Sequence, residues 1–180
     1  MIKISSRKRK SSTPASLEGL LIRKATPADL DGIRRIYNDA VRKTTATFDT
    51  QPRTATEQRR WFKKHGPSHP IMVAEARGRV VGWASLSPWS DRLAYSVTAE
   101  VSFYVEERSR GKGVGKKLLK AIVRGGKQAG LHSLLSRVTD ESTISIHLHE
   151  SLGFEHVGVM KEVGRKFGRL LDVSILQKIF

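Results

Sequence analysis

The chain has 180 residues, of which 38% are hydrophobic, and this suits one globular domain with a full apolar core. It has no cysteine, which excludes disulfides, thiolate metal sites and a cysteine nucleophile, and no apolar run approaches the roughly 18 residues of a membrane span. Lysine and arginine number 33 against 17 acidic residues, and the net charge of +16 favours an anionic partner: nucleic acid, an anionic membrane or a polyanionic cofactor.

Residues 1–18 form a basic tail with few apolar side chains, which we expect to be disordered. Such a run is either a solvated terminus or an arm that binds nucleic acid. No apolar segment follows the basic residues, so nothing indicates a secretion signal and we expect a cytoplasmic protein. With no internal repeat and no further boundary, residues 19–180 are predicted to form one domain.

Beyond the tail, seven strands and four helices are predicted, which is an α/β (α+β) composition. Two capping boxes, Thr26 to Asp29 and Thr54 to Glu57, predict where the first two helices begin. An Arg-Gly-Arg turn joins two strands as a hairpin, and glycines end the last two helices. In chain order we expect strand 20–24, helices 27–42 and 55–62, strands 71–76, 80–87 and 99–105, helix 116–129, strand 131–138, helix 143–152, and strands 154–163 and 171–180.

The strand at residues 99–105 leads into a glycine-rich turn. Its side chains alternate with the period of a half-buried strand, with Val101, Phe103 and Val105 on one face and Glu100, Ser102 and Tyr104 on the other. Then follow Arg110-Gly-Lys-Gly-Val-Gly115 and apolar residues at helical spacing. A helix N-terminus offers free N–H groups and a positive dipole end, so a strand, a glycine turn and a helix indicate a phosphate-binding loop.

Two common phosphate loops fail on spacing. A Walker loop needs serine or threonine after its lysine, but Lys117 follows Lys116. The dinucleotide fingerprint needs a third glycine where Lys116 or Leu118 stands. What remains, R-x-x-G-x-G between strand and helix, resembles the acetyl-CoA pyrophosphate loop of the GNAT superfamily of N-acetyltransferases. The other interpretation is a glycine-rich turn whose basic residues serve solubility.

Three further stretches are similar to one branch of that superfamily, the phosphinothricin acetyltransferases with the methionine sulfone and sulfoximine acetyltransferases. They are residues 94–105, 145–154 and 162–172, and with the loop they extend the resemblance over residues 20–180. It implies a GNAT fold, whose mixed sheet of about seven strands splays at the cofactor site, with acetyl-CoA as co-substrate, no metal, and a homodimer. It also implies acetylation of the amino group of a small amino-acid-like acceptor, and resistance to such herbicides or antibiotics.

The resemblance implies two catalytic residues. Glu100 matches the active-site glutamate that takes the proton of the acceptor ammonium, directly or through water; the alternative is a solvent-facing carboxylate paired with a cation. His149 stands where many of these enzymes have the tyrosine that protonates the departing thiolate, and histidine can carry that proton near neutral pH. The alternative for His149 is a packed helix histidine. His147 lies on a different helical face, so the two histidines do not form a metal site.

For acetyl-CoA, the resemblance implies main-chain groups of the strand, the glycine loop and two serines. Ser142 replaces the asparagine usual in the family and lacks its two-sided amide pairing, so weaker anchoring of the cofactor is our hypothesis. Arg110 is expected to position the loop rather than to contact phosphate. The implied cofactor-binding residues are Phe103, Tyr104, Val105, Arg110, Gly111, Lys112, Gly113, Val114, Gly115, Lys116, Ser142 and Ser151.

The acceptor site is implied beside the glutamate. Its residues are Arg92, Leu93, Ala94, Tyr95, Glu100, Val101 and Ser102, with Arg92, Arg165 or Lys166 to hold a carboxylate or phosphinate, and Phe48, Tyr37 and Trp89 as walls. A solvated surface or core packing is the alternative for these side chains. A nucleic-acid- or ribosome-associated protein on the same fold stays open because of the basic tail and charge. A protein N-acetyltransferase also stays open, since a fold does not choose its acceptor.

Overall fold

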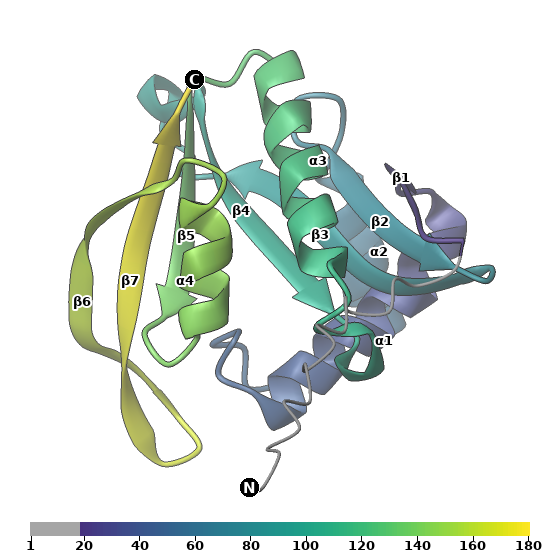
Figure 1. Ribbon diagram of the computed structural model, residues 1–180, viewed down its shortest axis with the longest axis horizontal. Helices are drawn as coiled ribbons and strands as arrows, with labels where there is room; N and C mark the ends of the chain where they lie inside the picture. Colours follow the sequence, from purple (N-terminus) through teal and green to yellow (C-terminus); the bar gives the residue numbers. More distant parts are fainter. Residues whose placement is uncertain (1–18) are drawn as a thin grey trace, which may run out of the picture.

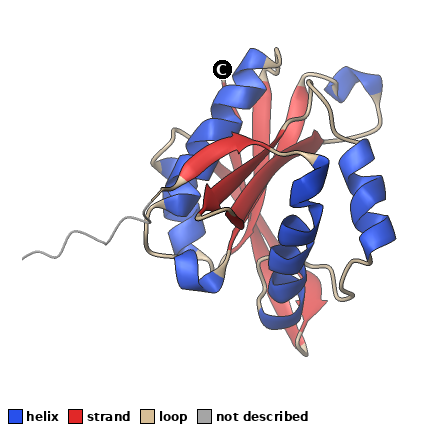
Figure 2. Cartoon of the chain, turned by 90° about the vertical axis from the view of Figure 1, so that its right-hand side faces the viewer, coloured by secondary structure: helices blue, strands red, loops and turns tan. Residues whose placement is uncertain are grey.

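A computed structural model describes residues 19–180, and the basic tail at residues 1–18 lies outside the described residues. One mixed sheet has the strand order β1-β2-β3-β4-β5-β7-β6, with helices on both faces (Figures 1 and 2). The strands are β1 (Leu21–Lys24), β2 (Ile71–Ala76), β3 (Arg79–Pro88), β4 (Thr98–Val105), β5 (Ser133–Thr139), β6 (Glu155–Lys166) and β7 (Arg169–Ile179). The α-helices are α1 (Leu30–Lys43), α2 (Ala55–Lys63), α3 (Val114–Gln128) and α4 (Thr143–Glu150). The expected composition of strands and helices is confirmed.

Two apolar layers hold the helices to the sheet. Helices α3 and α4 lie on one face and α1 and α2 on the other (Figure 2). Leu118 and Ile122 of α3 are fully buried against Leu134 of β5 in the first layer. Ile33 of α1 and Trp83 of β3 belong to the second. None of the helices within residues 19–180 is long and apolar enough to span a membrane.

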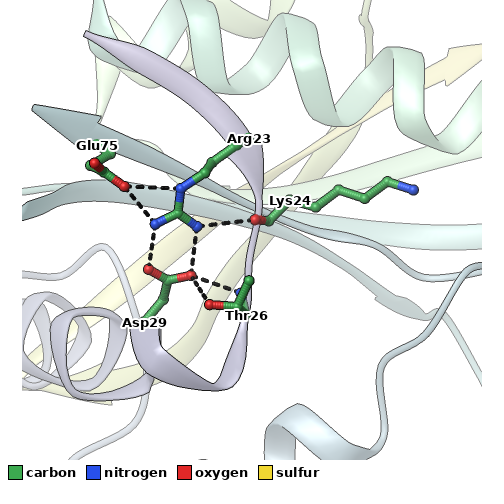
Figure 3. Close-up of polar contacts among 5 residues, drawn as sticks. All are labelled: Arg23, Lys24, Thr26, Asp29 and Glu75. Carbon is green, nitrogen blue, oxygen red and sulfur yellow. Dashed lines mark hydrogen bonds and ion pairs between the residues drawn. The ribbon is translucent and has the colours of Figure 1, made fainter. Parts of the chain in front are cut away.

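The first helix is fixed to the edge of the sheet by a partly buried ion-pair cluster (Figure 3). Arg23 of β1 donates to both carboxylate oxygens of Asp29, at 2.7 and 2.8 Å, and to Glu75 of β2 at 2.6 Å. Thr26 donates its main-chain N–H to the same Asp29 carboxylate at 2.7 Å. Burial alone would raise the pKa of Asp29, but the hydrogen bonds from Arg23 and Thr26 hold it below its usual value. The expected capping box therefore forms, and a 3₁₀ turn at Pro27–Asp29 leads into α1.

Strand β4 differs in part from the expected half-buried strand, because the face expected to be polar is covered at Tyr104. Tyr104, on the face expected to be polar, packs against Trp83 with ring centroids 4.8 Å apart. It also meets the ring of Tyr37 of α1 edge-on at 5.2 Å. The alternation in sequence is real, but α1 covers Tyr104 at the end of the face that also carries Glu100 and Ser102. Glu100 and Ser102 themselves remain partly exposed.

Strands β4 and β5 separate halfway along their length. They pair in parallel only from Thr98 with Ser133 to Glu100 with Leu135. Beyond that point β4 continues to Val105 and remains paired with β3, while β5 continues to Thr139 beside β7. The two strands diverge below α3 and α4 in Figure 1. The predicted splay of the sheet is confirmed.

The separation leaves main-chain groups of β4 without a partner strand. The N–H of Glu106 donates to Val81 of β3 at 2.9 Å. Main-chain N–H and C=O groups point alternately to the two sides along an antiparallel strand. Those of the even-numbered residues of β4 therefore point to β3, and those of the odd-numbered residues point to the opening. The residues directed at the opening are Val101, Phe103 and Val105. Of the three residues predicted to bind through their backbone, Phe103 and Val105 therefore face the opening and Tyr104 faces β3.

The C-terminal hairpin is longer than the sequence predicts. Strand β6 extends to Lys166 and β7 begins at Arg169, so only a two-residue turn joins them. The ladder between the strands shifts register between Met160 and Gly164, and Glu162 there has a φ of 51°. This bulge breaks the two-residue alternation of side chains within β6.

Candidate active site

A cavity of about 830 Å³ fills the opening between β4 and β5. Its walls are the diverging strands, the N-terminal ends of α3 and α4, and the C-terminal end of α1 with the loop at residues 44–46. Predicted site residues that line it are Val101, Ser102, Phe103, Tyr104, Val105, Arg110, Gly111, Gly113, Val114, Gly115, Lys116, Ser142 and His149.

The glycine loop forms one end of the cavity. Gly113, with a φ of +78°, is the N-cap of α3, and the first hydrogen bond of the helix runs from Lys117 to Gly113. The N–H groups of residues 114–116 therefore have no partner within the helix. A Cβ at Gly111 or Gly113 would meet no atom within 4 Å, so open space lies beside the loop. Free N–H groups, a helix dipole and nearby lysines make this end suited to an anion.

Arg110 fastens the loop to the central strand. Its Nε donates to the carbonyl oxygen of Val105 at 3.1 Å. This bond uses Nε and links the loop to the last residue of β4. That Arg110 positions the loop rather than contacting phosphate stays a prediction.

His149 is buried in the cavity wall with one ring nitrogen unpartnered. Nδ1 lies 2.8 Å from the carbonyl oxygen of Ser145, which can only accept, so Nδ1 carries the proton. Nε2 is buried and has no hydrogen-bond partner among the described residues. Burial lowers the pKa of His149, while the hydrogen bond to Ser145 opposes that shift. The rings of Phe103 and Phe154 lie 5.6 and 4.9 Å from the imidazole. His149 is thus a neutral imidazole with a free acceptor in the cavity wall.

Glu100 lies at the point where the strands separate, and Arg137 of β5 holds its carboxylate. Arg137 donates from Nε to Oε1 at 2.7 Å and from Nη2 to Oε2 at 2.6 Å, a two-bond ion pair. Hydrogen bonding to Glu100 raises the pKa of Arg137, so the guanidinium stays charged. Arg137 lines the cavity and Glu100 stands behind it. Arg137 belongs to none of the sequence motifs described above; a charged residue within the apolar strand 131–138 was the available signal.

Several predicted residues lie outside the cavity wall. Glu100 reaches the cavity through Arg137, and Lys112 lies on the loop away from the wall. Ser151 donates its hydroxyl to the carbonyl of Leu148 at 2.8 Å, at the far end of α4. The exposed 3₁₀ turn Leu93–Tyr95 and the residue before it also stand outside; these are Arg92, Leu93, Ala94 and Tyr95.

None of the three cations expected to hold a carboxylate lines the cavity. Lys166 is buried and donates from Nζ to the carbonyl of Thr47 at 2.6 Å, so this part of the prediction is corrected. Arg92 and Arg165 are exposed and do not line the cavity. Among the aromatic residues expected as walls, Tyr37 is core, Phe48 lies against Gly164, and Trp89 lies beneath the Arg137 guanidinium.

Comparison with known proteins agrees with this geometry. The chain is 42% identical over 158 residues to an L-methionine sulfoximine/L-methionine sulfone acetyltransferase of Pseudomonas paraeruginosa, covering 87% of this chain and 92% of that protein. A phosphinothricin acetyltransferase from Sinorhizobium meliloti, solved with acetyl-CoA, is 36% identical with a TM-score of 0.85, covering 89% of this chain and 88% of that one. A ribosomal-protein-alanine N-acetyltransferase from Brucella melitensis is 38% identical with a TM-score of 0.86, covering 89% of this chain and 99% of that one.

The family model for the acetyltransferase (GNAT) domain matches residues 22–175, which include every element of the cavity wall. Together with the splayed strands and the glycine loop, this match shows that the chain is an acetyltransferase that belongs to the GNAT family.

Proposed function

We propose that this enzyme transfers the acetyl group of acetyl-CoA to the amino group of a small amino-acid-like acceptor of the methionine sulfone, methionine sulfoximine or phosphinothricin type. The observation that carries the proposal is the cavity between β4 and β5, which joins an anion-binding helix terminus to a strand edge beside a carboxylate. The names of the similar proteins supply the acceptor class. Resistance to such compounds would follow from their acetylation.

The residues of the cavity fit acetyl-CoA. The free N–H groups at the start of α3 suit its pyrophosphate, with Lys116 beside them. The main-chain groups of Phe103 and the N–H of Val105, which face the opening, suit the amide groups of its pantetheine arm, as an added strand would. Bound there, acetyl-CoA supplies the thioester from which the acetyl group is transferred. The open space at Gly111 and Gly113 leaves room for the phosphates against the main chain.

Glu100 is the proposed general base. Only a free amine attacks a thioester, so the acceptor ammonium must lose a proton to a group near the end of the strand pairing. Glu100 is the carboxylate at that point, and its ion pair with Arg137 fixes where its oxygens lie. The proton reaches the carboxylate directly or through a water molecule.

His149 has a more restricted role than the one the resemblance implies. Its Nε2 begins as an acceptor, because the ring is neutral and Nδ1–H is committed to Ser145. A neutral imidazole cannot donate a proton from Nε2. We therefore propose that Nε2 acts as a hydrogen-bond acceptor in the cavity wall, and that His149 in this neutral state is not the acid that protonates the thiolate.

A thiol-release assay tests the proposal. Acetyl-CoA is offered with the common amino acids and with sulfone, sulfoximine and phosphinate analogues, and free thiol is measured. We expect turnover with the amino-acid analogues, and we expect Glu100→Gln to lower kcat by about 100-fold while the Kd for acetyl-CoA stays within about twofold. Absence of thiol release with every small amine would overturn the proposed acceptor class, and unchanged kcat in Glu100→Gln would remove the proposed base.

A second candidate is N-acetylation of a protein, because one similar structure is described as a ribosomal-protein-alanine N-acetyltransferase. A peptide with an N-terminal alanine in the same assay tests it. The nucleic-acid alternative is tested by filter binding at several salt concentrations, where a steep loss of affinity with salt would support it. A homodimer and a cytoplasmic location stay predictions; size-exclusion chromatography with light scattering tests the first.

A further inference from the structure

The guanidinium of Arg137 is only half used by its ion pair. Its Nε and Nη2 donate to Glu100, which leaves Nη1 and the second N–H of Nη2 without a partner in the described part of the chain. The side chain is 51% exposed and lines the cavity. Its guanidinium carbon lies 5.5 Å from the centre of the Trp89 ring, which supports the charged plane from beneath.

A guanidinium can bind two carboxylates at once. It presents its N–H groups in a fixed planar fork, with one two-donor edge formed by Nε and Nη2 and another formed by Nη1 and Nη2. Glu100 takes the first edge. The second edge is the unpaired one in the cavity, and a carboxylate there would form a charge-assisted pair without displacing Glu100.

We propose that Arg137 binds the carboxylate of the acceptor through its Nη1–Nη2 edge, and so selects acceptors that carry a carboxylate next to the reacting amine. This inference rests on the proposed function and adds a residue that the sequence motifs do not include. One guanidinium then holds both the general base and the acceptor.

The spacing in an α-amino acid suits this arrangement. Its nitrogen lies about 2.5 Å from its carboxyl carbon, a distance set by covalent geometry. An acceptor held on one edge of Arg137 therefore keeps its ammonium within a short reach of the base on the other edge. An amine without a carboxylate, or with a distant one, is not aligned in this way and should be acetylated more slowly.

The other cations in the cavity wall belong to other parts of the site. Arg110 donates to Val105, and Lys116 belongs to the start of α3. Lys43 is 3.6 Å from Asp39 on the same helix. Arg137 is the cation of the wall that touches Glu100.

The test compares two acceptors that differ only in the carboxylate: L-methionine sulfone and its carboxamide. Steady-state kcat/KM is measured with the full chain for the parent, Arg137→Gln, Arg137→Lys and the exposed control Arg60→Gln. We expect the parent to prefer the acid. We expect Arg137→Gln to lower kcat/KM for the acid about 10- to 150-fold more than for the carboxamide, the range for a lost hydrogen bond to a charged group. Arg137→Lys keeps the charge but not the planar pair of donors, so its kcat/KM for the acid should lie between those of the parent and Arg137→Gln.

Each other outcome is decisive. Equal losses for acid and carboxamide in Arg137→Gln would mean that Arg137 acts only by positioning Glu100, and would overturn the carboxylate assignment. A parent that turns over both compounds equally would overturn it as well, with the acetyltransferase function intact. No turnover of either by the parent would overturn the proposed acceptor class and this assignment with it. Melting curves of all variants identify any that fail to fold, and Arg137→Lys then supplies the comparison.

Discussion

Arg110 and Val105 are joined by a hydrogen bond from the arginine Nε to the valine carbonyl oxygen, 3.1 Å long. Val105 is the last residue of β4, and its main chain faces the opening between the strands. The bond therefore sets the position of the glycine loop relative to the strand edge, the two parts of the site that acetyl-CoA would have to bridge.

Arg110→Ala should weaken acetyl-CoA binding by loosening the loop. Loss of one hydrogen bond of ordinary strength, about 1 kcal/mol, corresponds to a rise in Kd of about fivefold in isothermal titration calorimetry. Arg110→Lys should not restore the affinity, because lysine cannot reproduce the Nε geometry. Arg108→Ala is the matched control, since Arg108 is an exposed arginine of the preceding turn. An equal effect of both alanine variants would point to loss of charge instead.

Gly113→Glu should abolish acetyl-CoA binding, and Gly130→Glu should not. The two glycines stand just outside opposite ends of α3 with φ of +78° and +79°, and neither Cβ would meet an atom within 4 Å. Both substitutions therefore carry a similar backbone strain of about 1–2 kcal/mol. Only the one at Gly113 places a carboxylate at the proposed phosphate site, so its Kd should rise at least about 100-fold. Retained binding in Gly113→Glu would contradict the assignment of the loop.

Local sequence signals predicted the elements of the fold well. The two capping boxes and the hairpin turn depend on residues within four positions of each other, so a short stretch of sequence carries the information. The glycine loop is similar: Arg110 to Gly115 are contiguous, and their turn needs the positive φ of Gly111 and Gly113. The splay between strands came from the resemblance and not from any local pattern.

What the sequence did not reveal depends on contacts between distant segments. The pair of Glu100 and Arg137 joins residues 37 positions apart, and it needs the parallel register of β4 with β5. The alternation of β4 predicts that Tyr104 points outward, but in the fold Tyr37 of α1 covers it. The neutral state of His149 follows from its burial, which the sequence of α4 does not encode.

Ser142→Asn should strengthen acetyl-CoA binding. Ser142 lines the cavity just before α4, and its hydroxyl lies 3.2 Å from that of Thr139. An asparagine there offers both a donor and an acceptor, and one additional hydrogen bond is worth about 1 kcal/mol, or a fivefold lower Kd. Ser151→Asn is the control, because Ser151 lies outside the cavity wall and should leave the Kd unchanged. Equal Kd values for Ser142→Asn and the parent would reject the hypothesis of weakened anchoring.

His149→Gln should reduce the loss of stability in mild acid. Burial lowers the pKa of His149 in the folded chain, so below the ordinary histidine pKa of about 6.5 the unfolded chain binds the proton more readily. The unfolded state then holds more protons, and the free energy of unfolding falls as the pH drops, by at most about 1.4 kcal/mol per pH unit for one histidine.

Urea unfolding at pH 7.5 and pH 5.5 should show a smaller difference in the free energy of unfolding for the variant than for the parent. Some pH dependence of the free energy of unfolding should remain in the variant, because burial also lowers the pKa values of His65 and His69. His147→Gln on the exposed side of α4 is the control, and an unchanged slope in His149→Gln would contradict the neutral, buried imidazole.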